Sequence, residues 1–320
     1  MAGYEYNGVY DPNARRPHPV AIVWKNGVAA PLTDGTRDAY ASSVAISGSD
    51  LYVAGRVIPN NYYSNSYAML WKNGVATHLT DGTQWASADS VAVSGGDIYV
   101  AGNDGSVATA WRNGVPTALT DGTQEAMTHS VAVSGSDVYA AGGVQTIVLS
   151  STWVAMIWKN GAATQLTASN TDVSADANSV AISGSYVYVA GYEATFYPGG
   201  SSVAKVWKNG VATPLTDGTR DAEAHFVAVT GGDVYVAGYE SNGAHWVATV
   251  WKNGVAARLT DGTQNSQAEC VAISGGDVYV AGYESNGTYR VAKVWKNGVA
   301  TPLTDGTHDA YANFILVNSH

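Results

Sequence analysis

The chain contains a single cysteine, which excludes an intrachain disulfide and any metal site built from cysteine ligands. Cys270 occupies a repeat position that holds serine elsewhere, so we expect a small buried residue there. No apolar run approaches the roughly 18 residues of a membrane-spanning segment. No long apolar pattern with the period of a helix is present either. The sequence therefore predicts neither helices nor membrane insertion.

Charged residues are also scarce. They make up 13% of the chain, and 16 Lys and Arg against 26 Asp and Glu give a formal net charge of −10. Without a basic stripe the chain lacks the cationic footprint of a nucleic-acid-binding protein, so we expect no nucleic acid partner. No signal peptide precedes the repeats. Because the chain opens inside an expected strand, a longer native parent could carry an upstream segment, and for it an extracellular or cell-surface location is plausible.

Glycine and large aromatic residues are abundant, with 36 Gly, 20 Tyr and 10 Trp. This composition favours short strands joined by tight turns. The tetrapeptide Trp-Lys/Arg-Asn-Gly repeats along the whole chain, beginning at Trp24, Trp71, Trp111, Trp158, Trp207, Trp251 and Trp295. Its spacings of 47, 40, 47, 49, 44 and 44 residues are near the period of a four-stranded propeller blade.

One repeat unit, from Cys270 to Thr307, divides into four expected strands. Strand A is Val271–Ile273 and strand B is Val278–Gly282. Strand C is Val291–Trp295 and strand D is Val299–Thr304. The Asn-Gly of the motif supplies the two positive-φ residues of a type I′ hairpin between strands C and D. Four consecutive antiparallel strands with short links form a meander.

The two ends of the chain complete each other. The sequence Ala-Gly-Tyr-Glu at residues 2–5 matches residues 281–284 at the end of a strand B, and residues 314–317 align with strand A. The sequence therefore predicts an all-β fold, a seven-bladed β-propeller of four-stranded antiparallel blades forming one domain over residues 1–320. The ring is closed by a C-terminal strand A that pairs with N-terminal strands B, C and D. Strand A is expected to be innermost, and the protein to be a monomer.

Loop length varies on one face only. The A–B and C–D turns have constant lengths, whereas the stretch from the strand B Gly to the motif Trp runs from 9 to 21 residues. In an antiparallel meander the B–C and D–A loops share one face, which we call the variable face; the A–B and C–D turns form the constant face. Binding residues concentrate on variable loops carried by a rigid scaffold.

Many aromatic residues outside the motif fall in the B–C and D–A regions. They are Trp85, Trp153, Trp246, Tyr40, Tyr62, Tyr63, Tyr67, Phe196, Tyr197, Tyr289 and Tyr311. Two interpretations stay open. These side chains either cover apolar surface and neighbouring loops, or form a stacking surface for a sugar or a protein.

Two repeat positions just ahead of strand A change identity in nearly every blade. Column one, two residues before the strand A Val or Ile, holds Ser42, Asp89, His129, Asn178, His225, Glu269 and Asn313. Column two, four residues before it, holds Tyr40, Ser87, Met127, Asp176, Glu223, Gln267 and Tyr311. With strand A innermost, these residues would surround the mouth of a central channel and form a ligand site. The alternative is that they are solvated strand ends.

We therefore select nine candidate ligand-binding residues from the columns and from the additional aromatic residues. They are Tyr40, Trp85, Asp89, His129, Trp153, His225, Trp246, Glu269 and Tyr311.

The sequence predicts no catalytic residue, metal site or cofactor. The recurring Asp-Gly-Thr offers one carboxylate per copy, too few for calcium, and is better explained as a turn. His129 and His225 lack a third ligand at a readable spacing. Acidic residues of the two columns could supply the carboxylate pair of a glycosidase, but nothing in the sequence sets their separation.

The unit that reads Asp-Val-Tyr-Val-Ala-Gly-Tyr-Glu-Ser-Asn-Gly at 277–287 is followed by Val-Ala-Lys-Val-Trp-Lys-Asn-Gly-Val-Ala-Thr-Pro-Leu-Thr-Asp-Gly-Thr at 291–307. It resembles the highly repetitive β-propellers of bacterial surface proteins and lipoproteins. The resemblance extends over essentially the whole chain and implies the propeller architecture. It implies no established activity, so no functional residue is transferred. Several blades depart from the Gly-Tyr-Glu pattern, with Arg56, Asn103 or Gly143 in place of the Tyr.

Three functional hypotheses follow. The leading one is a non-enzymatic binding module that recognises a glycan or a protein through the variable face. The second is a repeat scaffold, natural or engineered, without a dedicated ligand. The third is a carbohydrate-active enzyme at the channel mouth. A propeller fold by itself selects none of them.

Overall fold

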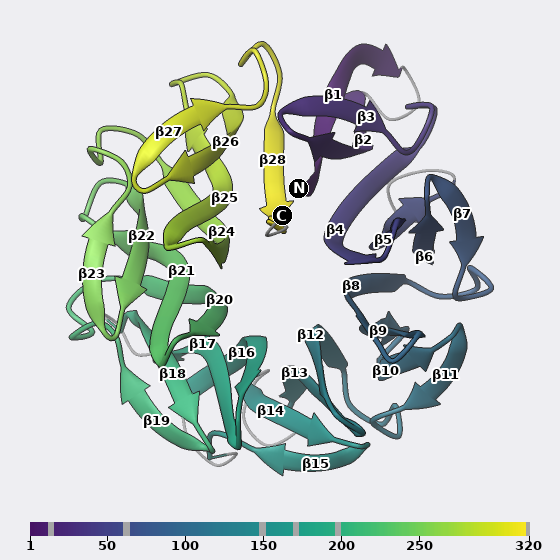
Figure 1. Cartoon of the computed structure of the whole chain (residues 1–320), viewed down its shortest axis with the longest axis horizontal. Coiled ribbons are helices and arrows are strands. Elements are labelled where there is room, and N and C mark those ends of the chain that lie inside the picture. The colour runs from purple at the N-terminus through teal and green to yellow at the C-terminus, as the bar shows by residue number, and fades with distance from the viewer. Residues whose placement is uncertain (12–15, 60–64, 147–151, 169–172, 196–199, 318–320) are drawn as a thin grey trace.

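The computed structural model describes residues 1–11, 16–59, 65–146, 152–168, 173–195 and 200–317. In these ranges the regular secondary structure is β-strand throughout, arranged in seven four-stranded antiparallel sheets. The sheets are blades arranged around a common axis, as Figure 1 shows. No helix in the described ranges is long and apolar enough to cross a membrane. The predicted seven-bladed propeller is confirmed.

The first strand of each sheet lies innermost, next to the axis (Figure 1). These inner strands are β4 (Asp38–Ser47), β8 (Ala86–Ser94), β12 (Ala126–Ser134), β16 (Val173–Ser183), β20 (Ala222–Thr230), β24 (Ser266–Ser274) and β28 (Ala310–Phe314). The second strands are β5 (Asp50–Ile58), β9 (Asp97–Asp104), β13 (Asp137–Gln145), β17 (Tyr186–Thr195), β21 (Asp233–Ser241), β25 (Asp277–Ser285) and β1 (Ala2–Asp11).

The third strands carry the motif Trp near their ends. They are β6 (Tyr67–Lys72), β10 (Val107–Arg112), β14 (Trp153–Lys159), β18 (Ser202–Lys208), β22 (Trp246–Lys252), β26 (Arg290–Lys296) and β2 (Arg16–Lys25). The outermost strands have four residues each and are exposed. They are β7 (Val75–His78), β11 (Val115–Ala118), β15 (Ala162–Gln165), β19 (Val211–Pro214), β23 (Val255–Arg258), β27 (Val299–Pro302) and β3 (Val28–Pro31).

The inner strands begin further upstream than the sequence indicated. Strand β24 begins at Ser266, whereas the predicted strand A begins at Val271. The added residues include the two variable columns, which alternate with small buried residues such as Ala268 rather than with large apolar ones. The columns therefore lie within the inner strands rather than ahead of them.

Both chain ends contribute to the closing blade, as predicted. Its strand order is β28-β1-β2-β3, and Gly3 pairs with Ala312. The closing strand is displaced relative to the prediction, since it runs from Ala310 to Phe314 and does not extend to Val317. Ile315 lies beyond the strand but is buried.

The hydrophobic core is divided into similar clusters between adjacent blades. Each of the seven motif Trp side chains is almost completely buried. Trp71, for example, packs with Ala2, Ala21 and Val23 of the neighbouring blade. Large indole rings fit there because the facing positions carry small residues. Cys270 is buried, as predicted.

The motif hairpins have the predicted geometry. The motif Asn residues have φ between 49° and 53°, and each following Gly also has a positive φ, which matches a type I′ turn. In the blade of β4–β7, Asn73 Oδ1 accepts a 2.8 Å hydrogen bond from Leu51 N, and Asn73 Nδ2 donates to Asp50. Lys72 forms a 2.7 Å ion pair with the same carboxylate. The constant face is thus built from a repeated, internally satisfied unit.

Candidate functional site

Column one coincides with a β-bulge in every blade. The pairing between each inner strand and its neighbour shifts register at this column, for instance between Ala224 and Phe226 around His225 and between Ala268 and Cys270 around Glu269. A bulge leaves one residue outside the regular ladder and can redirect its side chain. The seven bulges therefore place side chains of five kinds at equivalent points around the axis.

A glycine in the second strand makes the bulge possible. A Cβ added to Gly282 would lie 2.0 Å from the backbone oxygen of Gln267, and one added to Gly238 would lie 2.0 Å from that of Glu223. No Cβ can occupy that distance, so the inner strand crosses the second strand where only glycine fits. The same close approach occurs in all seven blades, at Gly3, Gly55, Gly102, Gly142, Gly191, Gly238 and Gly282.

Acidic and histidine side chains are linked between neighbouring blades on one part of the ring. His129 Nε2 lies 3.0 Å from Asp176 Oδ2 on the next blade. Burial opposes the charged imidazolium, but the Asp176 and Asp89 carboxylates outweigh it and raise the pKa of His129 to about 9. Burial raises the pKa of Asp89, whose Oδ2 accepts a 2.7 Å hydrogen bond from Ser87 Oγ.

His225 has a similar environment two blades away. Its Nδ1 lies 3.1 Å from Glu269 Oε2 and 3.2 Å from the Ala268 carbonyl oxygen, and its Nε2 lies 3.7 Å from Glu223 Oε2. Burial again opposes the charge, but Glu269 and Glu223 raise the pKa of His225 to about 10. The His225 ring also contacts Tyr239 edge to face, and Tyr239 lies 5.5 Å from Trp246.

Tyrosine rings occupy the adjoining part of the ring, around the closing blade. Tyr4 stacks on Tyr311 with 4.7 Å between ring centroids, and it meets Tyr40 edge to face at 4.8 Å. Tyr311 in turn contacts Tyr283 at 5.1 Å. We call Tyr4, Tyr40, Tyr283 and Tyr311 the tyrosine cluster. It spans three consecutive blades.

An arginine lies at each end of the tyrosine cluster. The Arg56 guanidinium carbon is 4.5 Å from the centroid of Tyr40 and 5.3 Å from that of Trp85. At the other end, the Arg290 guanidinium carbon is 5.4 Å from Tyr311 and 5.7 Å from Tyr283. All four distances fall in the range of cation–π contacts. Trp85 is 41% exposed and lines a pocket of about 550 Å³ together with Met127.

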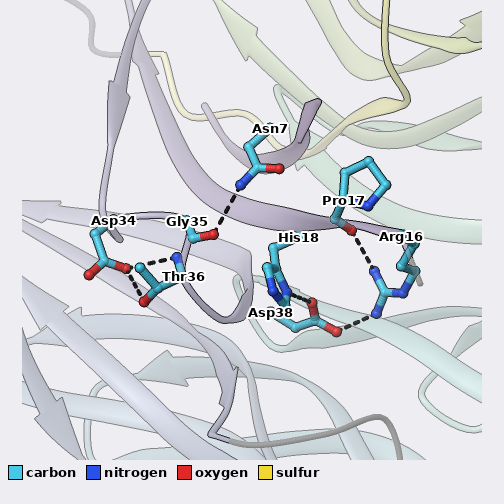
Figure 2. Close-up of polar contacts among 8 residues, drawn as sticks. All are labelled: Asn7, Arg16, Pro17, His18, Asp34, Gly35, Thr36 and Asp38. Carbon is cyan, nitrogen blue, oxygen red and sulfur yellow. Dashed lines mark hydrogen bonds and ion pairs between the residues drawn. The ribbon is translucent and has the colours of Figure 1, made fainter. Parts of the chain in front are cut away.

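Polar contacts fix the loops of the closing blade on the variable face (Figure 2). Asp38, at the start of β4, accepts from Arg16 and lies 2.8 Å from His18 Nδ1. Asn7 Nδ2 donates a 3.0 Å hydrogen bond to the Gly35 oxygen.

The Asp-Gly-Thr segments are turns, as predicted. Figure 2 shows Asp34 Oδ1 accepting from both the backbone nitrogen and the hydroxyl of Thr36, at 3.0 and 2.7 Å. The same pair of bonds recurs at Asp81, Asp121, Asp217, Asp261 and Asp305. Each carboxylate is thus used to hold its own turn. No group of three or more His, Cys, Asp or Glu side chains arranged to hold a metal is found among the described residues.

The structure places the nine candidate residues in three contact groups and one separate position. Tyr40, Trp85 and Tyr311 belong to the tyrosine cluster or its Arg56 end. Asp89 acts electrostatically on His129, which pairs with Asp176. His225, Glu269 and Trp246 are linked directly or through Tyr239.

Trp153, the first residue of β14, is half-buried over Gly143. Tyr62, Tyr63, Phe196 and Tyr197 lie outside the described residues.

The sequence-based selection of site residues did not include Arg56, Arg290, Tyr4 and Tyr283. Three of them occupy the same repeat position. Arg56, Tyr4 and Tyr283 each follow the strand B Gly and pair with a residue of column two. That repeat position also varies between blades. It holds Asn103, Gly143, Tyr192 and Tyr239 in the other four.

Because the two histidines have raised pKa values, we expect the protein to lose stability in alkaline solution. A group whose folded pKa lies above its unfolded value contributes fully below the unfolded pKa, near 6.5, and loses that contribution as the pH rises through the folded pKa. For His129 and His225 the loss therefore extends from about pH 6.5 to about 9–10. The free energy of unfolding, measured with urea, should be lower at pH 10 than at pH 7 by on the order of 1 kcal/mol or more.

The double variant His129→Gln/His225→Gln is the control. Burial also raises the pKa of the Cys270 thiol, to about 12, so ionisation of this thiol on unfolding lowers stability at high pH. This contribution is the same in the wild type and in the double variant. Between pH 7 and pH 10, the free energy of unfolding of the double variant should fall clearly less than that of the wild type. An equal decrease in both proteins would contradict the assignment.

No protein-family model matches the chain, and no curated protein is significantly similar to it. Solved structures do match. The β-propeller domain of the trilobed protease from Pyrococcus furiosus, described as having an open velcro topology, has a TM-score of 0.55 and 13% identity, with 93% of each chain covered. TolB from Acinetobacter baumannii has a TM-score of 0.50 and 10% identity, covering 81% of this chain and 65% of TolB.

A third match is the acylaminoacyl peptidase from Pyrococcus horikoshii, with a TM-score of 0.49, 14% identity and 90% of this chain covered. The chain spans half of that peptidase and less than two thirds of TolB. At these identities the likeness shows the fold alone. The chain has a propeller fold in common with the protease domain, but in contrast to the open topology described for that domain, a sheet made from both chain ends closes its ring.

The comparisons correct one expectation from the sequence. We expected the chain not to be an enzyme, but the propeller domain that covers 93% of it belongs to a protease. A propeller of this kind is therefore found in an enzyme, and the expectation, which rested on the absence of a catalytic motif in the sequence, is wrong. At 13% identity no catalytic residue or substrate is transferred to this chain.

Proposed function

We propose that the chain is a binding module that recognises a glycan or a protein through the variable face. The main support is column one. Seven equivalent bulges on the same backbone carry Ser, Asp, His, Asn and Glu side chains, whereas the motif Trp and the glycine beneath the bulge do not change. Packing alone requires no such diversity, and side chains that differ at fixed positions are suited to an asymmetric ligand.

A glycan is the ligand class that the exposed aromatic residues favour. Trp85 and Trp246 are 41% and 40% exposed, and Tyr289 is 39% exposed. Trp246 lies one ring away from His225 and its two carboxylate neighbours. Sugars bind through a flat apolar face and several hydroxyl groups, so they need an aromatic platform beside hydrogen-bonding side chains.

One observation favours the alternative of a scaffold without a dedicated ligand. Several column-one side chains bond to the next blade: Asn178 Nδ2 donates to the Ala224 oxygen at 3.0 Å, and Asn313 Nδ2 donates to the Ala41 oxygen at 2.9 Å. Such bonds support the ring whether or not a ligand binds. The two functions therefore need a binding experiment to separate them.

The test is a glycan array together with a pull-down, using the wild type, Trp85→Ala and Trp246→Ala. Tyr186→Ala is the matched control, because Tyr186 is similarly exposed, at 46%, but lies at an A–B turn on the constant face. We expect a ligand whose affinity falls about tenfold or more in at least one Trp variant and is unchanged in Tyr186→Ala. A wild type without any ligand, or binding insensitive to both Trp changes, would favour the scaffold.

A further inference from the structure

Arg56 occupies a position where no other blade carries a positive charge. The equivalent residues are Asn103, Gly143, Tyr192, Tyr239, Tyr283 and Tyr4. Its ring neighbours Tyr40 and Trp85 contact the guanidinium group without neutralising it. Arg56 therefore adds a positive charge to this sector of a protein whose net charge is negative.

The blade of Arg56 also lacks the Glu that four other blades carry at the next position. In two of the four blades that read Tyr-Glu, the Glu pairs with a lysine of the third strand: Glu193 with Lys205 and Glu284 with Lys293. In the blade of Arg56 the Glu is replaced by Val57 and the Lys by Met69. Arg56 thus stands in a blade from which this ion pair is missing.

Arg56 makes no ion pair or hydrogen bond with any residue that the structure describes. Its Nε is buried without a partner, while the residue as a whole remains partly exposed. By contrast, Arg16 pairs with Asp38, and Arg112 pairs with Asp97. The Arg56 charge acts on the Asp89 carboxylate and opposes the rise in the pKa of Asp89 that burial causes, but the two form no ion pair, and Asp89 accepts its hydrogen bond from Ser87 Oγ. A buried guanidinium edge without a carboxylate partner is costly unless a ligand supplies the anion.

We propose that Arg56, held between Tyr40 and Trp85, binds an oxyanion carried by a sugar ring, so that the ligand of the variable face is an acidic glycan. This inference rests on the proposed function and specifies its substrate class. The planar guanidinium group matches the two oxygens of a carboxylate, and a sulfate ester presents similar oxygens. Trp85 lies beside the guanidinium and is exposed, which places an aromatic platform next to the charge for the sugar ring.

Arg290 extends the same arrangement along the tyrosine cluster. Its guanidinium group lies over Tyr311 and Tyr283, at the end opposite to Arg56. Two cations joined by a row of tyrosine rings suit an oligosaccharide with several acidic units better than a single charged sugar. Arg56 is the primary contact, and Arg290 adds to the affinity for longer chains.

The experiment compares oligosaccharides that differ only in charge. The probes are oligogalacturonates and oligoglucuronates of four sugar units, their methyl esters, and sulfated and unsulfated tetrasaccharides of galactose, each titrated at low and physiological salt. The proteins are the wild type, Arg56→Gln, Arg56→Lys and, as a matched control, Arg258→Gln, which removes an exposed arginine from the outer strand β23. Thermal unfolding checks that each variant is folded.

We expect the wild type to bind at least one acidic probe at least ten times more tightly than its neutral counterpart. Arg56→Gln should abolish this difference, Arg56→Lys should retain part of it, and Arg258→Gln should leave it unchanged. Preference for the carboxylates or for the sulfated probe identifies the anion. Equal binding of acidic and neutral probes, or a charge preference that survives in Arg56→Gln, overturns the inference and leaves the proposed function intact. Absence of binding to every saccharide, these probes and the array included, overturns both the inference and a glycan ligand.

Discussion

Replacing Trp251 by alanine should lower the free energy of unfolding by about 3–5 kcal/mol. The Trp251 side chain is completely buried and packs between two blades, against Tyr188, Val206 and Ala222 among others. Its removal would leave a cavity that small alanine neighbours cannot fill, and the rigid ring offers little room for collapse. Urea unfolding followed by circular dichroism measures the loss.

Trp251→Phe distinguishes loss of volume from loss of a polar contact. The Trp251 Nε1 atom has no hydrogen-bond partner among the described residues, so phenylalanine should sacrifice little beyond some packing area. We expect it to cost much less than alanine. If both substitutions lower the free energy of unfolding equally, the indole N–H contributes more to stability than the packing argument allows. If alanine costs under about 1 kcal/mol, the blades do not depend on the motif Trp as we infer.

Changing Gly282 to alanine should destabilise the protein by about 1–3 kcal/mol or more. The added Cβ would lie 2.0 Å from the Gln267 oxygen, so the inner strand β24 must move away from β25. That movement occurs at the bulge that positions Glu269, and it should weaken the ion pair of Glu269 with His225. The variant should therefore lose both stability and part of the alkaline pH dependence.

Gly275→Asn is the control for this change. Gly275 has φ of +60°, and a Cβ there would meet nothing within 4 Å. Asparagine tolerates this backbone region, so we expect a change close to zero despite the larger side chain. Equal stability of Gly282→Ala and the wild type would show that the strands can separate at no cost, contrary to the close approach that we describe.

Most of the architecture could be predicted because the repeat carries its own signals. Seven motif Trp residues gave the number of blades, and Asn-Gly fixed the hairpins. The upstream half of each inner strand was missed because its buried positions carry only small side chains. In β24, Ser266 and Ala268 are fully buried and alternate with Gln267 and Glu269, but no large apolar residue marks the segment as a strand.

The site was predicted as a set of positions but not as a set of contacts. Variation between repeats singled out His129 and Glu269, which were expected just ahead of strand A and lie within the inner strands. It could not reveal that His129 pairs with Asp176, which is 47 residues away, because repeat alignment does not show which neighbours approach across blades. In the sequence, Arg56 was only a departure from the repeat. Its proposed role in binding depends on the contacts of its guanidinium group with Tyr40 and Trp85, which the sequence does not show.

The bulge over glycine also affects how this protein can evolve. The backbone at each column-one position is fixed by its own blade. A duplicated blade therefore already contains a bulge that exposes a variable side chain. The half-buried Ser42 side chain makes no hydrogen bond with any residue that the structure describes, so it can change alone. His225 is different, because it is held by Glu223 and Glu269. These three must diversify together, so new specificities should arise first in the sector of Ser42 and Arg56.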